Sequence, residues 1–359
     1  MYPTKVTVLE IQNNKTVAEI RHGLRQQILH LKPSDFEQLA LQVFRYQALY
    51  NPVYSQYVKL LNIRVDEVNE LTKIPFLPIQ FFKTHIVRTG LVSEAKITFQ
   101  SSGTTGQQTS RHALYDEELY KVVSEQIFQD NYRDLNQFHI LALLPSYLER
   151  NNSSLVYMMQ HFIEKSGSPY SGFYLNNIAE MLQVLRNLIN AEDKKRILLL
   201  GVTFALLDLA EGSFDLQFIG KSDKVIVMDT GGMKGRRREM LREEVHDVLK
   251  RGFAVDNIHS EYGMTELLSQ GYSSGNGSFE PGRTMRILLR DINDPFAIYD
   301  HNVGISKTGG INVIDLANLD TCSFIETQDL GRFEESAGRF NVMGRFDNSD
   351  IRGCNLMVL

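Results

Sequence analysis

Residues 224–232 read KVIVMDTGG, an apolar run that ends in an aspartate, a threonine and two glycines. Two similar runs precede it, RILLLG at 196–201 and HILALLP at 139–145. Continuous apolar runs that end at Gly or Pro are typical of strands covered on both faces. Stretches with helical patterning separate or follow these runs, at 153–165, 178–190 and 235–251. The alternation of strands and helices predicts a parallel α/β layer.

The segments on either side of this layer have other patterns. Residues 34–73 favour helices, with Ser34 as the expected N-cap of the first one. Residues 74–82, IPFLPIQFF, contain two prolines, so we expect this segment to be extended. Short strands and turns after residue 280 predict an antiparallel sheet or small barrel packed on the α/β layer. The expected organisation is a helical part at 1–96, an α/β core at 97–280 and a β-rich subdomain at 281–359.

The composition excludes several classes of protein. The chain has 359 residues, of which 43% are hydrophobic and 23% charged, as in a globular protein. Its net charge of −5 gives no electrostatic reason to expect a nucleic-acid partner. No apolar run approaches the roughly 18 residues of a membrane span, and the N-terminus lacks the apolar centre of a signal peptide. Two cysteines without a histidine cluster form neither a disulfide framework nor a zinc site, so we expect a cytoplasmic protein.

A cluster of Ser, Thr and Gly stands out at 100–112, which reads QSSGTTGQQTSRH. Such a loop can cradle phosphate, because glycines let backbone N–H groups approach an anion while hydroxyls donate hydrogen bonds. The alternative is a solvated turn between two strands. The loop is not a Walker motif, since Gln107 stands where that motif requires lysine. The segment GNGSFE at 275–280 is not a dinucleotide fingerprint, since Glu280 replaces its third glycine.

Three further motifs follow this loop in chain order, namely YGMTE at 262–266, TQDLGR at 327–332 and GRFD at 344–347. Together with SSGTTG at 101–106, they resemble the signature of adenylate-forming enzymes, which include acyl-CoA synthetases, luciferases and peptide-synthetase adenylation domains. The resemblance implies an α/β adenylating domain with a small β-rich subdomain, and ATP and Mg²⁺ as cofactors. It also implies a ligase that first forms an acyl-adenylate.

Five other segments make the resemblance narrower, namely NPVYSQYVKLL, KIPFLPIQFFK, LPSYLERNNSSLVYMM, DTGGMKGR and IRGCNLM. They are similar to the LuxE-type acyl-protein synthetase family, the fatty-acid-activating component of the bacterial bioluminescence aldehyde-supplying complex. That family is related to phenylacetate-CoA ligases. The resemblance implies a carboxylic acid as substrate, fatty in the family case, and an acyl reductase or another acyl-acceptor protein as partner. Whether the protein forms a homo-oligomer stays open.

The resemblance implies a role for each residue around the phosphates. The residues that would wrap the β- and γ-phosphates are Ser101, Ser102, Gly103, Thr104, Thr105 and Gly106. Thr265 would contact the α-phosphate, and Glu266 would hold Mg²⁺, a hard cation that prefers oxygen ligands. Where many relatives continue this loop with a lysine, Arg111 could replace it. Taken alone, Glu266 could also be an exposed carboxylate at the start of a helix.

The resemblance assigns a second group of residues to the nucleoside, namely Gly231, Gly232, Tyr262, Gly263, Asp329 and Arg345. Tyr262 would stack on adenine opposite the two glycines at 231 and 232. Asp329 would accept hydrogen bonds from the ribose hydroxyls, with Arg345 nearby. Each has an ordinary alternative, because glycines also end strands and Asp329 could be a turn residue.

The second step of the reaction would use Cys354, which lies in RGCNLM where the family has its acyl-accepting cysteine. A thiolate that attacks the acyl-adenylate gives a thioester on the protein. By composition alone, an unpaired cysteine is a small buried hydrophobe, and Cys322 is expected to be one. Candidate bases for the thiol are His112, His161 and His259.

Several alternatives stay open. Adenylating enzymes usually carry a C-terminal lobe that rotates to admit coenzyme A, and we expect this chain to lack it. The first alternative is still an acyl- or aryl-CoA ligase, and the second is a non-catalytic subunit that binds a nucleotide or an acyl group. Phe81, Phe82 and Tyr157 could line an acyl tunnel or belong to an ordinary core. The basic run KGRRRE at 234–239 is expected to be the solvated start of a helix.

Overall fold

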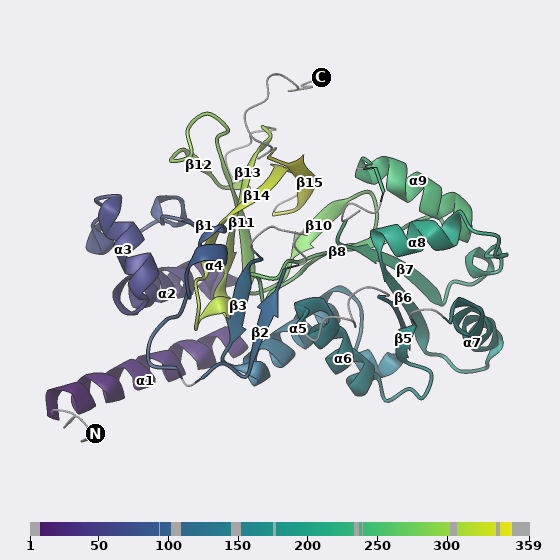
Figure 1. Cartoon of the computed structure of the whole chain (residues 1–359), viewed down its shortest axis with the longest axis horizontal. Helices are drawn as coiled ribbons and strands as arrows, with labels where there is room; N and C mark the ends of the chain where they lie inside the picture. The colour runs from purple at the N-terminus through teal and green to yellow at the C-terminus, as the bar shows by residue number, and fades with distance from the viewer. Residues whose placement is uncertain are drawn as a thin grey trace.

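A computed structural model describes nine segments of the chain (Figure 1), namely 8–92, 94–101, 109–144, 152–174, 177–232, 237–238, 240–301, 307–334 and 338–346, with side chains from residue 16 onward. No helix in these segments is both long enough and apolar enough to cross a bilayer.

The apolar runs form the parallel half of a large sheet. Its strands, in spatial order, are β5 (Gly172–Tyr174), β4 (Phe138–Leu143), β6 (Arg196–Val202), β7 (Val225–Thr230) and β8 (His259–Tyr262). Every residue of β4 is buried, and only the first residue of β6 and of β7 is partly exposed. The predicted parallel α/β layer is therefore confirmed.

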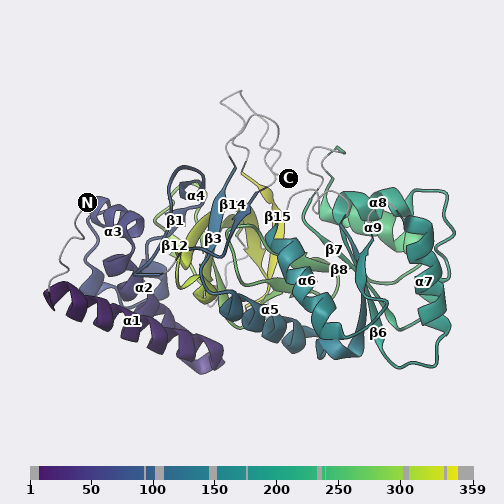
Figure 2. The same cartoon turned by 60° about the horizontal axis from the view of Figure 1, so that its bottom comes forward.

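Helices cover both faces of this parallel half (Figures 1 and 2). Two of them, α8 (Thr203–Ala210) and α9 (Arg242–Phe253), lie side by side on one face. The helices α5 (Glu117–Asn131) and α6 (Ser154–Ser166) lie on the opposite face. A fifth helix, α7 (Ile178–Asn190), begins and ends where the sequence predicted. Strands buried on both faces need this double cover, which explains their continuous apolar runs.

The β-rich part continues the same sheet. Beyond β8 the antiparallel strands follow in the spatial order β9 (Gly271–Ser273), β10 (Ser278–Pro281), β15 (Phe340–Arg345), β14 (Phe324–Phe333), β13 (Gly309–Asp315), β11 (Met285–Arg290) and β12 (Ile298–Tyr299). The strand β10 joins the two halves, because Phe279 pairs with β15 and Glu280 pairs with β9. The predicted antiparallel sheet is confirmed. This sheet continues the parallel layer, because β10 bonds to strands of both halves.

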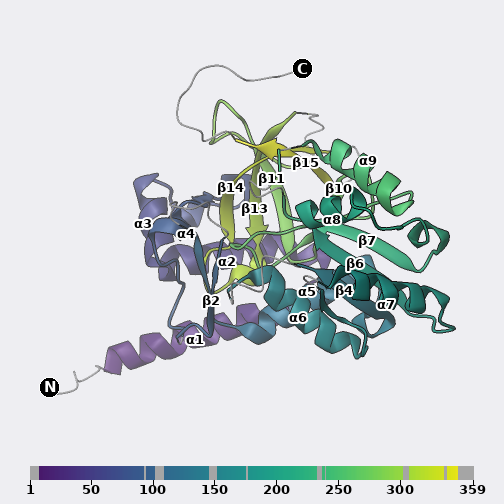
Figure 3. The same cartoon turned by 45° about the vertical axis from the view of Figure 1, so that its right-hand side comes forward.

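The N-terminal helices are α1 (Val8–Leu29), α2 (Phe36–Tyr50) and α3 (Pro52–Leu60), followed by the single turns η2 (Val65–Glu67) and η3 (Leu71–Lys73). The end of α1 nearest the N-terminus projects beyond the rest of the molecule (Figures 1 and 3). The predicted N-cap is wrong, because Ser34 lies in the turn η1 (Pro33–Asp35) and donates to the Asp35 carboxylate at 2.8 Å. Asn51 caps α3 instead of continuing α2, by accepting from the backbone N–H of Tyr54.

The segment at 74–82 is extended only in part. Its strand β1 (Leu77–Pro78) pairs in parallel with β14, as an extended segment can. The short helix α4 (Phe81–Thr84) then begins, so the prediction is wrong for its last two residues. Both prolines precede α4, so they do not remove its hydrogen bonds, and the N–H of Phe82 donates to the Ile79 carbonyl at 3.1 Å.

Arg237 and Arg238, the described part of the basic run, lie outside α9, so the prediction that the run starts this helix is wrong for these two residues; 234–236 and 239 lie outside the described residues. The helix begins at Arg242. At its N-terminus, the N–H of Leu241 donates to the Glu244 carboxylate at 3.1 Å. Arg237 instead pairs with carboxylates of α8 and its C-terminal end, and its Nε donates to Asp208 Oδ1 at 2.9 Å.

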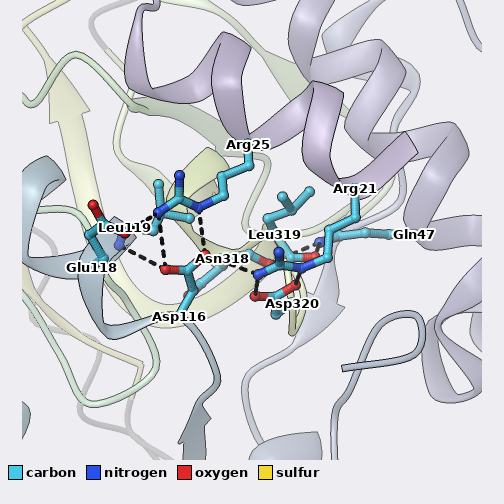
Figure 4. A network of polar contacts seen from close by, with 9 residues as sticks. All are labelled: Arg21, Arg25, Gln47, Asp116, Glu118, Leu119, Asn318, Leu319 and Asp320. Carbon is cyan, nitrogen blue, oxygen red and sulfur yellow. Dashed lines mark hydrogen bonds and ion pairs between the residues drawn. The ribbon is translucent and has the colours of Figure 1, made fainter. Parts of the chain in front are cut away.

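A polar cluster fastens α1 to the rest of the molecule (Figure 4). Arg21 donates to both carboxylate oxygens of Asp320 at 2.6 Å and reaches Asp116 at 3.0 Å. Arg25 donates to Asp116 at 2.7 Å. Asp116 is also the N-cap of α5, where it accepts the N–H of Leu119 at 2.9 Å. The hydrogen bonds with Asp320 raise the pKa of Arg21, so its guanidinium stays charged.

We expect Arg21→Met to destabilise the protein by about 3 kcal/mol, because it removes the cation that faces the buried Asp320. The matched variant Arg25→Met should lower the free energy of unfolding by only about 1 kcal/mol, since Asp116 keeps both Arg21 and its cap bond. Urea denaturation of both variants checks this. Equal losses would contradict the special role of the Arg21–Asp320 pair.

Candidate active site

The Ser, Thr and Gly cluster connects the hairpin strands β2 (Ile97–Gln100) and β3 (Arg111–Leu114). Ser101 and Ser110 close the base of this loop: the N–H of Ser101 donates to the Ser110 carbonyl at 3.1 Å, and the N–H of Ser110 to Ser101 Oγ at 2.9 Å. The other predicted phosphate-binding residues, Ser102, Gly103, Thr104, Thr105 and Gly106, lie outside the described residues, so their role stays a prediction. Arg111 is exposed on β3.

The base of this loop contacts the YGMTE motif. Glu266 is buried with 5% of its surface exposed, and the Ser110 side chain lies close enough to its carboxylate to influence its pKa. Burial raises the pKa of Glu266, while the Ser110 side chain and the positive charge of Arg345 lower it. The alternative of an exposed carboxylate at a helix start is therefore wrong. The neighbours of Glu266 therefore offset only part of the cost of burying its negative charge. Such a carboxylate is suited to bind a cation, which would offset the rest.

Glu266 fits Mg²⁺ in one restricted sense. Within the described segments, no group of three or more His, Cys, Asp or Glu side chains could hold a metal ion. Mg²⁺ is usually held by one or two carboxylates together with substrate phosphates. A single buried carboxylate is thus compatible with a metal that arrives with a nucleotide, and it does not suit a permanent metal centre.

The other motifs meet at Asp329. The Tyr262 hydroxyl donates to Asp329 Oδ2 at 3.0 Å, and Arg345 Nε donates to Oδ1 at 2.9 Å. Asp329 and Arg345 face each other on β14 and β15, so Asp329 is a strand residue and the turn alternative is wrong. Burial, with the negative charge of Asp329, raises the pKa of Tyr262 well above its usual value. The Tyr262 ring packs at right angles to Phe340, with centroids 5.3 Å apart.

The two predicted glycines lie at the end of β7. Gly231 has φ +72°, in the left-handed region that glycine adopts without strain. A Cβ at Gly232 would meet no atom within 4 Å, so open space borders this position. This leaves room for a ligand beside the strand end, and the adenine-wall role stays a prediction.

Glu261, directly before Tyr262, is a second buried carboxylate in this segment and is not among the predicted site residues. It accepts a hydrogen bond from the Thr230 hydroxyl. A Cβ at Gly263 would lie 2.3 Å from Glu261 Oε1, so glycine at this position makes room for the carboxylate. Burial, with a smaller contribution from the charge of Asp229, raises the pKa of Glu261 to about 7 although the Thr230 bond opposes the shift. The position of Glu261 directly before Tyr262 of the YGMTE motif is the feature of the sequence that could have identified it.

We expect Glu261 to make the protein less stable as pH rises from about 4.5 to about 7, because the folded state binds this proton more tightly than the unfolded state. Glu261→Gln removes the titration. Relative to wild type, the variant should gain on the order of 3 kcal/mol between pH 4.5 and pH 8. Urea denaturation at several pH values measures this difference, and a difference that does not change with pH would contradict it.

The loop between β8 and β9, residues 263–270, contains the end of the YGMTE motif and is called the motif loop below. A corner of the β-rich part, residues 315–321, holds this loop in place. It includes the turn η7 (Leu316–Asn318). The carboxylate of Asp315 accepts the N–H groups of Leu268 at 2.7 Å and Ser269 at 3.0 Å. The side chain of Asn318 donates to the Glu266 carbonyl at 2.8 Å. The corner therefore fixes the backbone that follows Thr265.

The N-terminal helices hold this corner in turn. Gln47 of α2 donates to the carbonyls of Asn318 at 2.9 Å and Leu319 at 3.1 Å, next to the Arg21–Asp320 pair (Figure 4). Asn51 donates to the Thr321 carbonyl at 2.8 Å. These helices thus support the candidate site although they lie outside the four motifs.

The three candidate bases all have other partners. His112 contacts the Thr265 carbonyl, His161 the Glu125 carboxylate at 3.2 Å, and His259 the Tyr132 hydroxyl at 3.1 Å. Burial lowers the pKa of all three, to about 4 for His112 and for His259. Cys354 lies outside the described residues, so any role of these histidines toward it stays a prediction.

The other predicted side chains belong to the core. Cys322 is fully buried, which raises the pKa of its thiol to about 12 and confirms the expected hydrophobic role. Phe82 is also fully buried, Tyr157 packs against the rings of Phe99 and Tyr120, and Phe81 packs against the ring of Tyr57. An acyl tunnel along these side chains stays a prediction.

Comparison with known proteins identifies a family. The family model described as "Acyl-protein synthetase, LuxE" matches residues 32–359. No curated protein matches the sequence.

Several solved structures are similar to this chain at low sequence identity. The amide bond synthetase McbA from Marinactinospora thermotolerans is 14% identical over 70% of this chain and 49% of its own, with a TM-score of 0.42. An acyl acid amido synthetase in complex with 2,4-DB is 13% identical over 96% of this chain and 72% of its own, with a TM-score of 0.48. A fatty acyl-adenylate ligase from a study of the E. coli and L. pneumophila enzymes is 15% identical over 69% of this chain and 50% of its own, with a TM-score of 0.44. This chain thus spans about half the length of the first and third of these proteins.

Proposed function

Because the chain belongs to the LuxE family of acyl-protein synthetases, as its motifs predicted, we propose that it is an ATP-dependent ligase that joins a carboxylic acid to AMP. The carboxylate of the acid attacks the α-phosphorus of ATP. The bond to the bridging oxygen breaks, and pyrophosphate leaves with the electron pair. The product is acyl-AMP, a mixed anhydride. No proton moves in this step, so the site has to supply positive charge and hydrogen-bond donors rather than a base.

One observation supports the proposal: residues of three of the four motifs, Tyr262, Asp329 and Arg345, meet through direct contacts. The Tyr262 hydroxyl bonds to Asp329, which bonds to Arg345, and the Ser110 side chain at the base of the phosphate loop lowers the pKa of Glu266. Arg345 also lowers the pKa of Glu266, so the two halves of the site influence each other. Residues that are far apart in sequence thus form one polar site, with the buried carboxylate of Glu266 at one end and that of Asp329 at the other.

In this proposal each residue has a defined task. Glu266 would hold Mg²⁺, which when bound offsets the charge of the phosphates, and Thr265 would contact the α-phosphate. Asp329 would accept hydrogen bonds from the ribose, and Tyr262 would border the adenine. Arg345 is 73% exposed beside the buried Asp329, so it can turn toward an incoming nucleotide while its partner stays in place.

For the second step we propose Cys354 as the acceptor. Its thiolate attacks the acyl carbonyl carbon of acyl-AMP, the bond to the phosphate oxygen breaks, and AMP leaves with the electron pair. The protein then carries a thioester. A partner protein, an acyl reductase in the family case, would take the acyl group from it. The acid we favour is a fatty acid.

Exchange of labelled pyrophosphate into ATP tests the first step. We expect incorporation that requires both Mg²⁺ and a carboxylic acid, with fatty acids of increasing length compared with phenylacetate. The absence of exchange with every acid would overturn the proposal and would favour a non-catalytic binding subunit. The formation of acyl-CoA when coenzyme A is added would favour the CoA-ligase alternative over Cys354.

A further inference from the structure

The buried ring of His112 lies where three parts of the candidate site meet. This residue belongs to β3, two positions after Ser110, and 1% of its surface is exposed. Its Nδ1 lies 2.8 Å from the Thr265 carbonyl oxygen of the motif loop. Its Nε2 lies 3.1 Å from the Thr321 hydroxyl of the corner 315–321. One ring therefore connects the phosphate-loop hairpin, the motif loop and the corner.

The partners of His112 determine its tautomer. A carbonyl oxygen can only accept a hydrogen bond, so Nδ1 carries the hydrogen. The buried ring is neutral, so Nε2 accepts from the Thr321 hydroxyl. The Thr321 carbonyl is held by Asn51, and the edge contact with Phe82, at 5.5 Å and 88°, fixes the plane of the ring. The ring is therefore a fixed donor aimed at Thr265.

This donor completes a pair of bonds around Glu266. His112 holds the carbonyl of the peptide group before Glu266, and Asn318 holds the carbonyl of the peptide group after it, at 2.8 Å. Peptide groups are planar, and only two dihedral angles at the Cα join them. Fixing both peptide groups therefore fixes the direction in which the Glu266 side chain leaves the backbone.

We propose that His112 is a positioning residue for the nucleotide site: its Nδ1–H holds the Thr265 carbonyl and so aims the Glu266 carboxylate at the metal–nucleotide complex. The inference rests on the proposed function and adds a residue that does not itself touch the substrate. An ordinary core histidine would contribute equally through both ring nitrogens. A positioning role depends on the Nδ1 bond alone.

Two substitutions separate these roles. The side-chain amide nitrogen of asparagine can occupy the place of Nδ1, whereas that of glutamine reaches the place of Nε2. His112→Asn thus keeps the donor to Thr265, and His112→Gln keeps only the contact with Thr321. Each variant loses one hydrogen bond, so we expect similar losses of thermal stability from the two.

Pyrophosphate exchange at several MgATP concentrations is the first measurement. We expect His112→Asn to stay within about threefold of wild type, and His112→Gln to lose about 10- to 100-fold in kcat/KM with a raised KM for MgATP. Equal exchange by the two folded variants, or better exchange by His112→Gln, would overturn the inference.

A second pair of variants covers the case in which neither substitution at His112 folds. Thr321→Val removes only the partner of Nε2, so exchange should stay within about threefold of wild type. Asn318→Leu removes the second carbonyl bond and should lower exchange about tenfold or more. The reverse order would overturn the inference.

Calorimetric titration of the variants with MgATP separates the inference from the proposed function. If the wild type does not exchange pyrophosphate with any acid, the proposed function fails. The inference then stands on MgATP affinity, which should fall in His112→Gln about tenfold more than in His112→Asn. Equal MgATP affinities of the two variants would overturn it.

Discussion

Replacing Cys354 with alanine should abolish the hydroxylamine-sensitive label that the protein acquires from labelled fatty acid and ATP. The chain contains two cysteines, and Cys322 is fully buried with a thiol pKa of about 12. Cys322 therefore has neither the exposure nor the thiolate fraction for attack on acyl-AMP. A thioester on this chain requires Cys354. Pyrophosphate exchange should survive in the variant, because it reports only the first step.

The matched control is Cys322→Ala. This substitution removes a buried sulfur and should cost about 1 kcal/mol of stability, while the label on the folded protein stays complete. A label that persists in Cys354→Ala would contradict the assignment of Cys354 as the acyl acceptor. A label that disappears in a folded Cys322→Ala would do the same.

The second large effect is expected from Glu266→Gln, which should lower the rate of acid-dependent pyrophosphate exchange about 100-fold or more. Glutamine keeps the shape of the side chain but loses the charge that would hold Mg²⁺. The protein itself should be as stable as wild type at neutral pH or more stable. The reason is that burial raises the pKa of Glu266, so its ionised form is unfavourable in the folded state.

Glu261→Gln is the control for this experiment. Both residues are buried carboxylates with raised pKa values, and they lie five positions apart in one segment. Glu261 accepts a hydrogen bond from Thr230 within the sheet, whereas the pKa of Glu266 is influenced by Ser110 at the base of the phosphate loop. We expect Glu261→Gln to gain stability and to keep exchange within about threefold of wild type. Parallel losses of exchange in both variants would show that any buried charge in this segment matters equally.

The local elements of the fold were readable from the sequence because short-range patterns set them. The run at 224–232 predicted β7, and the helical stretch at 178–190 matched α7 residue for residue. The helix α1 was predicted only in outline, as part of a helical segment at 1–96, although the buried residues Val17, Leu24 and Ile28 are spaced seven and four apart. Its other positions are too polar to draw attention to that spacing.

The candidate site was only partly predictable. Its motif residues could be named, because each motif is contiguous in the chain. Its supports could not, because Gln47 contacts Asn318 across 271 residues, and neither residue type signals such a contact. Ser110 and His112 were missed as supports for the same reason, since their partners in the motif loop are about 155 residues away.

The strand β10 has a practical consequence for anyone who wishes to divide this chain. A fragment that stops at residue 280, the expected end of the α/β core, would be cut inside that strand, since β10 runs from Ser278 to Pro281. Each piece would then expose a row of unsatisfied backbone donors and acceptors along an open sheet edge. Such edges recruit other chains, so the separate pieces should aggregate where the intact chain does not.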